Sequence, residues 1–282
     1  MTQSPPVVVL GTGPSSSKSH VCVGLARILV RRGVQALPFK AITVLDHEDD
    51  VPIPLHVAAA GVPWRREMSP VIVRPLPGGT TGRLEIDGEP LCRVHLSAPD
   101  TVDATQLSAA HRARLVSVVS EALDALGTRL DGVLVVEGAG SPIDAVDDIA
   151  NVAVLRELRR RSDLGVPRVV LSAFCRNGGS LAAIAGTHRL IPADLRELIV
   201  GYVLNGPMPR AAIEHWDREL ERSTGLRRLG LAPYLPLSPE EIAARTADEQ
   251  ADLWADALAD TRVEALFGPG VAGPAPVSAV HW

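Results

Sequence analysis

The 282-residue sequence has few cysteines, no strongly basic run and no long hydrophobic run. Its cysteines, Cys22, Cys92 and Cys175, are scattered without a CxxC pair, so their spacing predicts no metal site and indicates a reducing compartment. The net charge is −5 and Lys/Arg-rich runs are missing, which argues against a nucleic-acid-binding protein. Apolar stretches stay below the roughly 18 residues that a membrane span needs, and the N-terminus is polar. We therefore expect a cytoplasmic protein that acts on small molecules.

Hydrophobic periodicity predicts an α/β fold. Short β-branched runs without alternation are typical of strands buried on both faces of a parallel sheet, and they lie at residues 7–10, 133–136, 168–171 and 199–204. Segments with helical periodicity alternate with them, at residues 19–32, 107–126, 151–162, 180–190 and 211–224. This alternation predicts a doubly wound, mainly parallel sheet with right-handed crossovers. Residues 75–103 are richer in Gly, Thr and short strand-like pieces, which predicts an excursion from that sheet.

The segment between the first strand and the first helix resembles a phosphate-binding loop. It reads GTGPSSSKS over residues 11–19. Such a loop wraps backbone N–H groups around phosphates, directs a Lys to the β/γ oxygens and offers a Ser hydroxyl to Mg²⁺. Lys18 and Ser19 occupy those two positions. The candidate nucleotide-binding residues are therefore Gly11, Thr12, Gly13, Ser15, Ser16, Ser17, Lys18, Ser19 and His20.

Two features of this loop depart from the common pattern. The loop is one residue longer, and Ser17 stands where Gly normally precedes the Lys. Ser tolerates fewer backbone conformations than Gly. A Ser-rich turn that caps a helix is the alternative interpretation, because Ser is a favourable N-cap residue.

Two charged residues follow other predicted strands. Glu137 comes after residues 133–136, and a carboxylate at the C-terminal end of a parallel strand can hold Mg²⁺ directly or through water. A Gly-rich turn with one exposed acid is the alternative. Lys40 ends the segment 34–39 and would point into the same crevice, although a lone Lys is usually solvated.

These segments, in this order, resemble those of cobyric acid synthases. The resemblance rests on residues 11–19, 38–40, 58–61, 68–71, 136–142, 148–151, 178–179, 186–187 and 229–236, and it extends over roughly residues 6–237. Dethiobiotin synthetases, which are built on the same P-loop NTPase-like synthetase fold, are more distant relatives. The resemblance implies a P-loop synthetase domain over residues 1–237. Residues 238–267, acidic and helical in pattern, are expected to be a segment of the same domain, and residues 268–282 a loosely ordered tail.

The resemblance also implies an ATP- and Mg²⁺-dependent, amide-forming ligase. Such an enzyme phosphorylates a substrate carboxylate, and ammonia or an amine attacks the acyl phosphate. The implied site consists of Lys18, Lys40 and Asp148 for catalysis, Ser19, Glu137 and Asp50 for Mg²⁺, and Asn205 and Pro233 in addition to the loop for the nucleotide. Three of these have simpler alternatives: Asp148 as a helix cap, Asn205 as a turn residue and Asp50 as part of an acidic surface loop.

Departures from the family lie on the substrate side. After Lys40, where a cobyric acid synthase has a Gln-Asn pair and a longer loop, this chain has AIT and then a shortened acidic segment, DHEDD, at residues 46–50. An Asp is also missing before the GG of residues 178–179. We therefore expect an acceptor that is smaller than a corrinoid.

The nitrogen donor and the reaction stay open. No Gly-flanked Cys follows Cys175, so we expect free ammonia, an amine or a separate glutaminase as the donor. Related synthetases suggest a homodimer. Two other functions remain as alternatives: a nucleotide-binding regulatory protein without ligase activity, and a CO₂-dependent ring closure like that of dethiobiotin synthetases.

Overall fold

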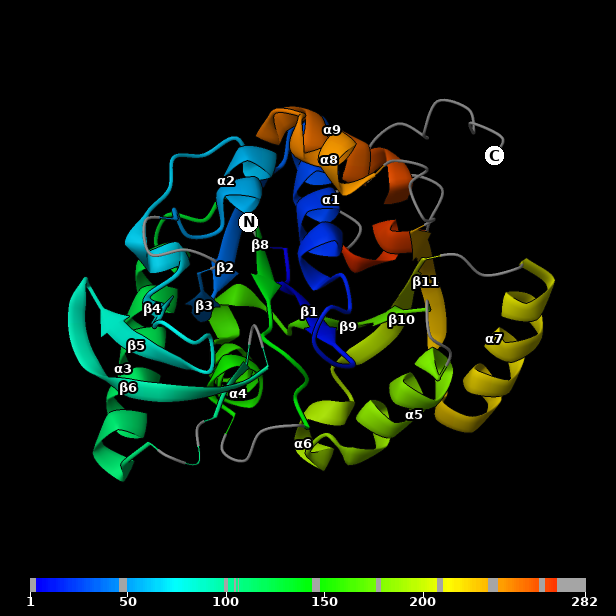
Figure 1. Cartoon of the computed structure of the whole chain (residues 1–282). Coiled ribbons are helices and arrows are strands. Elements are labelled where there is room, and N and C mark those ends of the chain that lie inside the picture. The colour runs from blue at the N-terminus through cyan, green and yellow to red at the C-terminus, as the bar shows by residue number, and fades with distance from the viewer. Residues whose placement is uncertain are drawn as a thin grey trace.

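The central element of the fold is a six-stranded parallel sheet with the strand order β11-β10-β9-β1-β8-β2 (Figure 1). The structure is a computed structural model and describes residues 4–45, 50–98, 101–103, 105, 107–143, 148–175, 179–206, 210–232, 238–258 and 262–267. The strands of this sheet are β1 (Val7–Gly11), β2 (Gln35–Lys40), β8 (Gly132–Glu137), β9 (Arg168–Phe174), β10 (Ile199–Asn205) and β11 (Arg227–Ala232). All four strands predicted from β-branched runs are present, as β1, β8, β9 and β10. The predicted class, a doubly wound and mainly parallel α/β fold, is confirmed by the strand order and by the parallel pairing of all six strands.

Helices cover both faces of this sheet, because alternate residues of each strand point to opposite faces. Val7 and Val9 of β1 pack in one hydrophobic cluster with residues of α1 (Lys18–Arg31), α2 (Pro54–Ala60) and α9 (Ala247–Leu258). Val8 and Leu10 pack in the other cluster, with α3 (Ala109–Gly127), α4 (Val154–Arg160), α5 (Ser180–Leu190), α6 (Ala193–Arg196) and α7 (Arg210–Thr224). The shorter helical elements are η1 (Arg66–Met68), a π-helix (Ile149–Ala153), η4 (Ser162–Leu164), α8 (Pro239–Ala243) and η5 (Arg262–Leu266).

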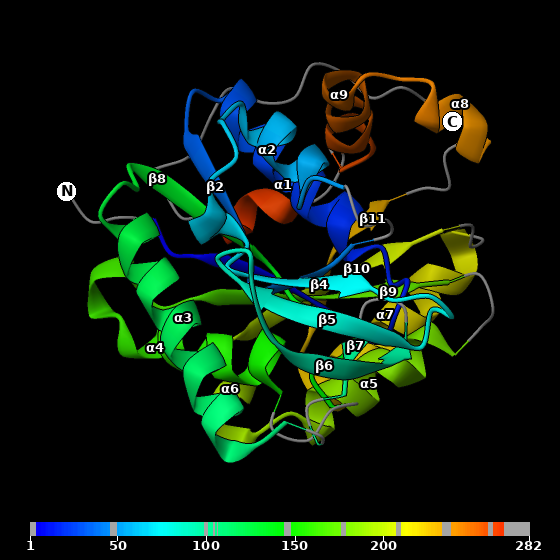
Figure 2. The ribbon, with the colours of Figure 1, turned by 60° about the vertical axis from the view of Figure 1, so that its left-hand side comes forward.

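A second sheet lies beside the β2 edge of the first, on the left in Figure 1 and toward the viewer in Figure 2. Its strand order is β3-β4-β5-β6-β7, and its strands are β3 (Ile42–Val44), β4 (Val71–Pro75), β5 (Thr81–Ile86), β6 (Glu89–Ala98) and β7 (Thr101–Val102). Only the β3–β4 pair is parallel among these. The excursion predicted at residues 75–103 thus forms the antiparallel part of this sheet.

Helix α9 packs directly on α1, the helix that follows the phosphate-loop sequence. Arg27 of α1 pairs with Asp252 of α9 at 2.7 Å, and Arg31 pairs with Asp252 and Asp256 at 2.7 and 2.5 Å. Gly24 permits the close approach, since a Cβ there would lie 2.5 Å from Cδ1 of Leu258 and 2.7 Å from the Trp254 carbonyl oxygen. Within the described segments, no helix is long and apolar enough to cross a membrane.

We expect Gly24→Ala to lower the free energy of unfolding by about 1–3 kcal/mol, because the added methyl group would force α9 away from α1. Gly186→Ala is the matched control: Gly186 also lies in a helix, α5, and a Cβ there would meet no atom within 4 Å. That change should be neutral or stabilising by up to about 1 kcal/mol. Denaturant titration of both variants checks the prediction, and equal effects would show that the α1–α9 contact can relax at no cost.

Candidate functional site

The phosphate-loop sequence runs from the end of β1 to the start of α1, at the C-terminal edge of the parallel sheet. Ser17 adopts a left-handed backbone conformation with φ 62° and ψ 26°, and Ser15 has φ 54°. Residues other than Gly are strained there by about 1–3 kcal/mol, and such strain is found at ligand-binding turns. The Ser17 side chain forms no capping hydrogen bond with α1. The alternative of a Ser-rich capping turn is therefore not supported at this residue.

Gly11 allows the loop to fold tightly against the segment that follows β8. A Cβ at Gly11 would lie 2.3 Å from Oγ of Ser16 and 2.7 Å from the Gly140 carbonyl oxygen. Strand β9 anchors the other side, since Oγ of Ser172 donates to the Ser16 carbonyl at 2.6 Å and the Thr12 N–H donates to the Ser172 carbonyl at 3.0 Å. Oγ of Ser16 is buried and has no partner among the described protein atoms. A buried hydroxyl of this kind fits a loop that binds a polar ligand.

Glu137, at the end of β8, is the centre of the site. Its Oε1 accepts hydrogen bonds from Oγ of Ser19 at 2.9 Å and from Nζ of Lys40 at 2.7 Å. Its Oε2 accepts from Nε2 of His56, in α2, at 2.5 Å. The contact with Lys40 follows from strand register, because Lys40 of β2 is directly opposite Glu137 in the parallel β2–β8 pair.

The Glu137 carboxyl is only 1% exposed, yet its surroundings favour the charged form. Burial by itself raises the pKa of a carboxyl. The charges of Lys40 and His56 and the hydrogen bonds from both outweigh burial and hold the pKa of Glu137 well below its usual range. An ionised carboxylate beside a Ser hydroxyl supplies the oxygen ligands that Mg²⁺ prefers, so these residues fit the metal that a phosphate loop requires.

Lys18 and His20 lie on α1 beside Ser19. The Lys18 side chain is buried, and its Nζ donates to the Gly13 carbonyl at 3.3 Å. The His20 ring stacks on Trp254 of α9 with ring centroids 3.8 Å apart. Burial lowers the pKa of His20 to about 4, against an opposing effect from the charge of Glu137. His20 thus joins the α1–α9 contact, and its part in nucleotide binding stays a prediction.

The remaining nucleotide and metal candidates are less directly placed. Asn205, at the end of β10, is buried, and its Nδ2 donates to Oγ of Ser172 at 2.9 Å. Because Ser172 in turn donates to the Ser16 carbonyl, Asn205 helps to hold the phosphate-loop sequence against β9. Pro233 lies outside the described residues. Asp50 lies between β3 and α2. Among the described side chains, the potential metal ligands that come together are Cys22, His56 and Glu137, and Asp50 does not belong to that group.

Asp148 has the geometry of a helix cap. Its Oδ1 accepts from the N–H groups of Ala150 and Asn151 at 2.9 and 3.0 Å, and its Oδ2 accepts from Nδ2 of Asn151 at 2.7 Å. The structure therefore shows the helix cap that the sequence offered as the alternative role of Asp148. Asp148 also lines a groove of about 1290 Å³ between α3, α4 and α6, where Ile149 and Arg156 are neighbours. A role in catalysis stays a prediction.

Sequence patterns did not indicate His56 or Cys22 as site residues. His56 is a single histidine in the otherwise apolar helix α2, and Cys22 lies on the buried side of α1. Both reach the site only because α1 and α2 pack together beside β8. Glu137 and Lys40, by contrast, follow strands, and strand ends meet at one edge of a parallel sheet.

We expect the buried Asp148 carboxyl to make stability depend on pH. Burial raises its pKa to about 6 and outweighs the hydrogen bonds from Asn151 and the backbone. The folded protein therefore holds this proton more tightly than the unfolded chain, in which Asp titrates near ~3.9. The resulting stability is complete below about pH 4 and is lost as the pH rises through about 6, a change of about 3 kcal/mol.

Asp148→Asn isolates this contribution because Asn does not titrate. Denaturant titrations at several pH values should show wild-type stability falling, relative to the variant, as the pH rises from 4 to 7. A constant difference between the two proteins would contradict the raised pKa.

Comparisons with known proteins agree with the motifs. No family model matches the chain. The probable cobyric acid synthase of Archaeoglobus fulgidus is 32% identical over 243 residues, which cover 82% of this chain and 49% of that protein. The cobyric acid synthase of Roseiflexus castenholzii is 30% identical over 256 residues, covering 86% and 49%. The chain is related to cobyric acid synthases. It spans about half the length of the curated cobyric acid synthases that it matches.

Solved structures are similar at a lower level. Chloroplast FtsY from Physcomitrella patens is 13% identical with a TM-score of 0.46, over 90% of this chain and 65% of that chain. FtsY from Thermotoga maritima is 10% identical with a TM-score of 0.41, over 90% and 70%. The resemblance to cobyric acid synthases stated from the sequence is confirmed by the sequence relatives alone.

Proposed function

We propose that this chain is an ATP- and Mg²⁺-dependent ligase that activates a carboxylate of a small metabolite for amide or ring formation. The observation that supports the proposal most is the convergence of Ser19 and Lys40 on the ionised Glu137, beside a strained Ser- and Gly-rich loop. This arrangement occurs in a chain similar to cobyric acid synthases.

Each residue has a role in this proposal. Lys18 would bind the β/γ-phosphates, Ser19 and Glu137 would hold Mg²⁺, and Lys40 would balance the negative charge of Glu137 and the phosphates. Phosphoryl transfer depends on positioning and charge stabilisation more than on covalent catalysis, so these side chains suffice for the first step. ATP would phosphorylate the acceptor carboxylate with release of ADP. Attack by ammonia or an amine on the acyl phosphate would then form the amide and release phosphate.

The identity of the acceptor has to be found by experiment. The names of the relatives give no support to the expectation of an acceptor other than a corrinoid. The acidic segment that motivated this expectation falls mostly on residues 46–49, outside the described residues. A corrinoid and small carboxylates therefore both belong in the test.

The test measures ADP release and hydroxamate formation when hydroxylamine is present to trap an acyl phosphate. The acceptor panel contains a corrinoid diamide, small dicarboxylates, and a diamine with labelled bicarbonate for ring closure. Hydroxamate that requires ATP, Mg²⁺ and one carboxylate would support the ligase and identify the acceptor. Label from bicarbonate in the product would instead identify ring closure.

A nucleotide-binding protein without ligase activity is the second candidate. The left-handed φ angle of Ser17 favours it, because this strained Ser stands immediately before Lys18, where the common phosphate loop has a Gly. Stoichiometric ATP binding in calorimetry without ADP release or hydroxamate from any acceptor would support this second candidate over the ligase.

Asp148→Asn should lower kcat and kcat/KM for the acceptor together, by about 10²-fold, with little change in ATP affinity, if Asp148 acts beside the reacting carboxylate. A purely capping role predicts unchanged kinetics, because Asn caps a helix as well as Asp does. Steady-state kinetics and the melting temperature of the same variant distinguish the two roles. Normal kinetics would remove Asp148 from the catalytic residues.

A further inference from the structure

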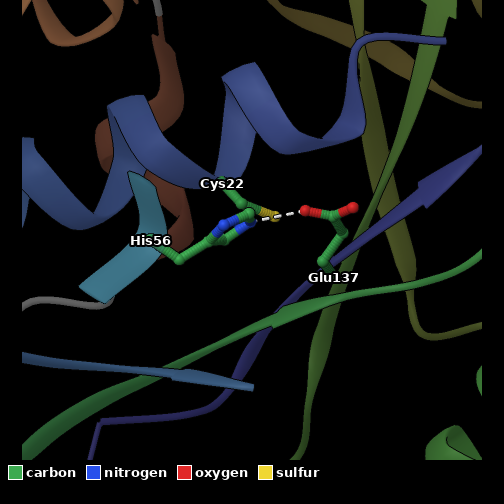
Figure 3. A group of neighbouring side chains, drawn as sticks. All are labelled: Cys22, His56 and Glu137. Atoms are coloured by element: carbon green, nitrogen blue, oxygen red, sulfur yellow. Dashed lines mark hydrogen bonds and ion pairs between the residues drawn. The ribbon is translucent and has the colours of Figure 1, made fainter. Parts of the chain in front are cut away.

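Three potential metal ligands of different chemistry come together between α1, α2 and the C-terminal end of β8. Cys22 comes from α1, His56 from α2 and Glu137 from the end of β8, and the figure shows their side chains directed toward one another (Figure 3). One ligand atom from each lies within 4.8 Å of the other two. All three residues are buried, with exposed fractions of 1%, 7% and 1%. The set was not expected from cysteine spacing, because its members are far apart in the sequence.

We propose that Cys22, His56 and Glu137 form a binding site for a thiophilic divalent cation, with Zn²⁺ as the best match. Thiolate, imidazole and carboxylate are the ligand types that Zn²⁺ takes, commonly three from the protein with water in a fourth position. Mg²⁺ prefers oxygen ligands in octahedral geometry and is disfavoured by sulfur. The donor set therefore selects a different ion from the one proposed for Ser19 and Glu137.

The two oxygens of Glu137 allow this site to coexist with the loop contacts. Oε1 accepts from Ser19 and Lys40, whereas Oε2 faces His56. A cation on Oε2 would replace the His56–Glu137 hydrogen bond and the weak hydrogen bond from Cys22 to the Val136 carbonyl, and it would leave the contacts of Oε1 in place. Ligand atoms around tetrahedral Zn²⁺ are about 3.3–3.8 Å apart, given metal–ligand bonds of about 2.0–2.3 Å. Nε2 and Oε2 now lie 2.5 Å apart, so they must move apart by about 1 Å when the cation binds.

Binding of Zn²⁺ would release protons from the ligands, and the charges of the site would balance. The S–H bond of Cys22, which now points to the Val136 carbonyl at 3.8 Å, breaks as the S–Zn bond forms, and the proton goes to solvent. His56 must also give up the Nε2 proton that it now donates to Glu137; this proton goes to solvent, and the remaining ring hydrogen is on Nδ1. The thiolate and the carboxylate then balance the dication, while the ammonium of Lys40 stays on Oε1. No oxidant or reductant is required.

Cobalt is the probe, because Co²⁺ takes tetrahedral zinc sites and a cysteine thiolate bound to it gives a near-ultraviolet charge-transfer band. We expect one equivalent of Co²⁺ to produce this band in the full chain and one equivalent of Zn²⁺ to bleach it. Excess Mg²⁺ should leave the band unchanged. This readout needs neither ATP nor turnover, so its failure is independent of the proposed ligase.

Cys22→Ser should abolish the band, and Cys92→Ser is the matched control. Cys92 is a free, partly buried cysteine in β6 of the second sheet, so its loss should change nothing. His56→Gln, with Cys22 intact, should weaken Co²⁺ binding at least about 10-fold and decides the case if Cys22→Ser does not fold. Absence of the band in the wild type, its survival in Cys22→Ser, or unchanged affinity in His56→Gln would overturn the proposal.

Discussion

Lys18→Ala is expected to reduce ATP turnover by at least about 10³-fold while leaving the fold intact. In the proposed function the ammonium group contacts the β/γ-phosphates, and one of its hydrogen bonds in the structure is to the Gly13 carbonyl of its own loop. That hydrogen bond joins two residues of one loop, so its loss should leave the packing of the helices on the sheet unchanged. Radiolabelled ADP release measures turnover, and the melting temperature reports the fold.

Lys18→Met is the companion variant, since it keeps the unbranched stem and removes only the charge. Both variants should lose turnover to a similar extent, because the loss comes from the missing charge and not from a cavity. Undiminished turnover and ATP affinity in either variant would remove the phosphate-loop assignment.

Glu137→Gln is expected to raise the Mg²⁺ concentration needed for half-maximal turnover by about 10–100-fold, because one anionic ligand is lost. ATP binding without metal should change much less. The substitution also leaves the ammonium of Lys40 without its carboxylate, so a loss of stability of about 3–5 kcal/mol is expected as well. Magnesium titrations of turnover, together with calorimetry of ATP binding in EDTA, separate these effects.

Glu85→Gln controls for the electrostatic part of that change. Glu85 in β5 is a buried carboxylate that pairs with Arg74 and Arg83 at 2.9 and 2.6 Å, outside the candidate site. Its replacement should lower stability without altering the magnesium requirement. Equal losses of metal-dependent and metal-free binding in Glu137→Gln would instead assign Glu137 a purely structural role.

The sequence predicted those strands in which nearly every residue is buried, whichever face of the sheet it points to. Strands β1, β8, β9 and β10 are buried on both faces and therefore read as continuous apolar runs. Strands β5, β6 and β7 of the second sheet were recognised only as an excursion, because their residues alternate in part between buried and exposed and they pair in antiparallel fashion. Strands β3 and β4 lie outside the predicted range, apart from Pro75. Strand β2 was anticipated as the segment 34–39 that Lys40 ends.

The candidate site, like the fold, could be predicted only where local sequence determines the position of a residue. Ser19, Lys40 and Glu137 begin a helix or end a strand, so local sequence places them at one edge of the sheet. The positions of His56 and Cys22 depend on how α1 and α2 pack, which no local pattern specifies. The dual position of Asp148, as a cap and as part of a groove wall, likewise depends on tertiary contacts.

The sequence contains two lysines, and the structure places both at the same edge of the central sheet. Lys18 begins α1 and Lys40 ends β2. A protein sample in which lysine alone carries ¹³C and ¹⁵N would therefore give side-chain NMR signals from these two residues and no others. Each resonance would report the candidate site directly in an otherwise silent spectrum. Nucleotides, metals and acceptor candidates could be titrated against wild-type protein with a spectroscopic label already in place.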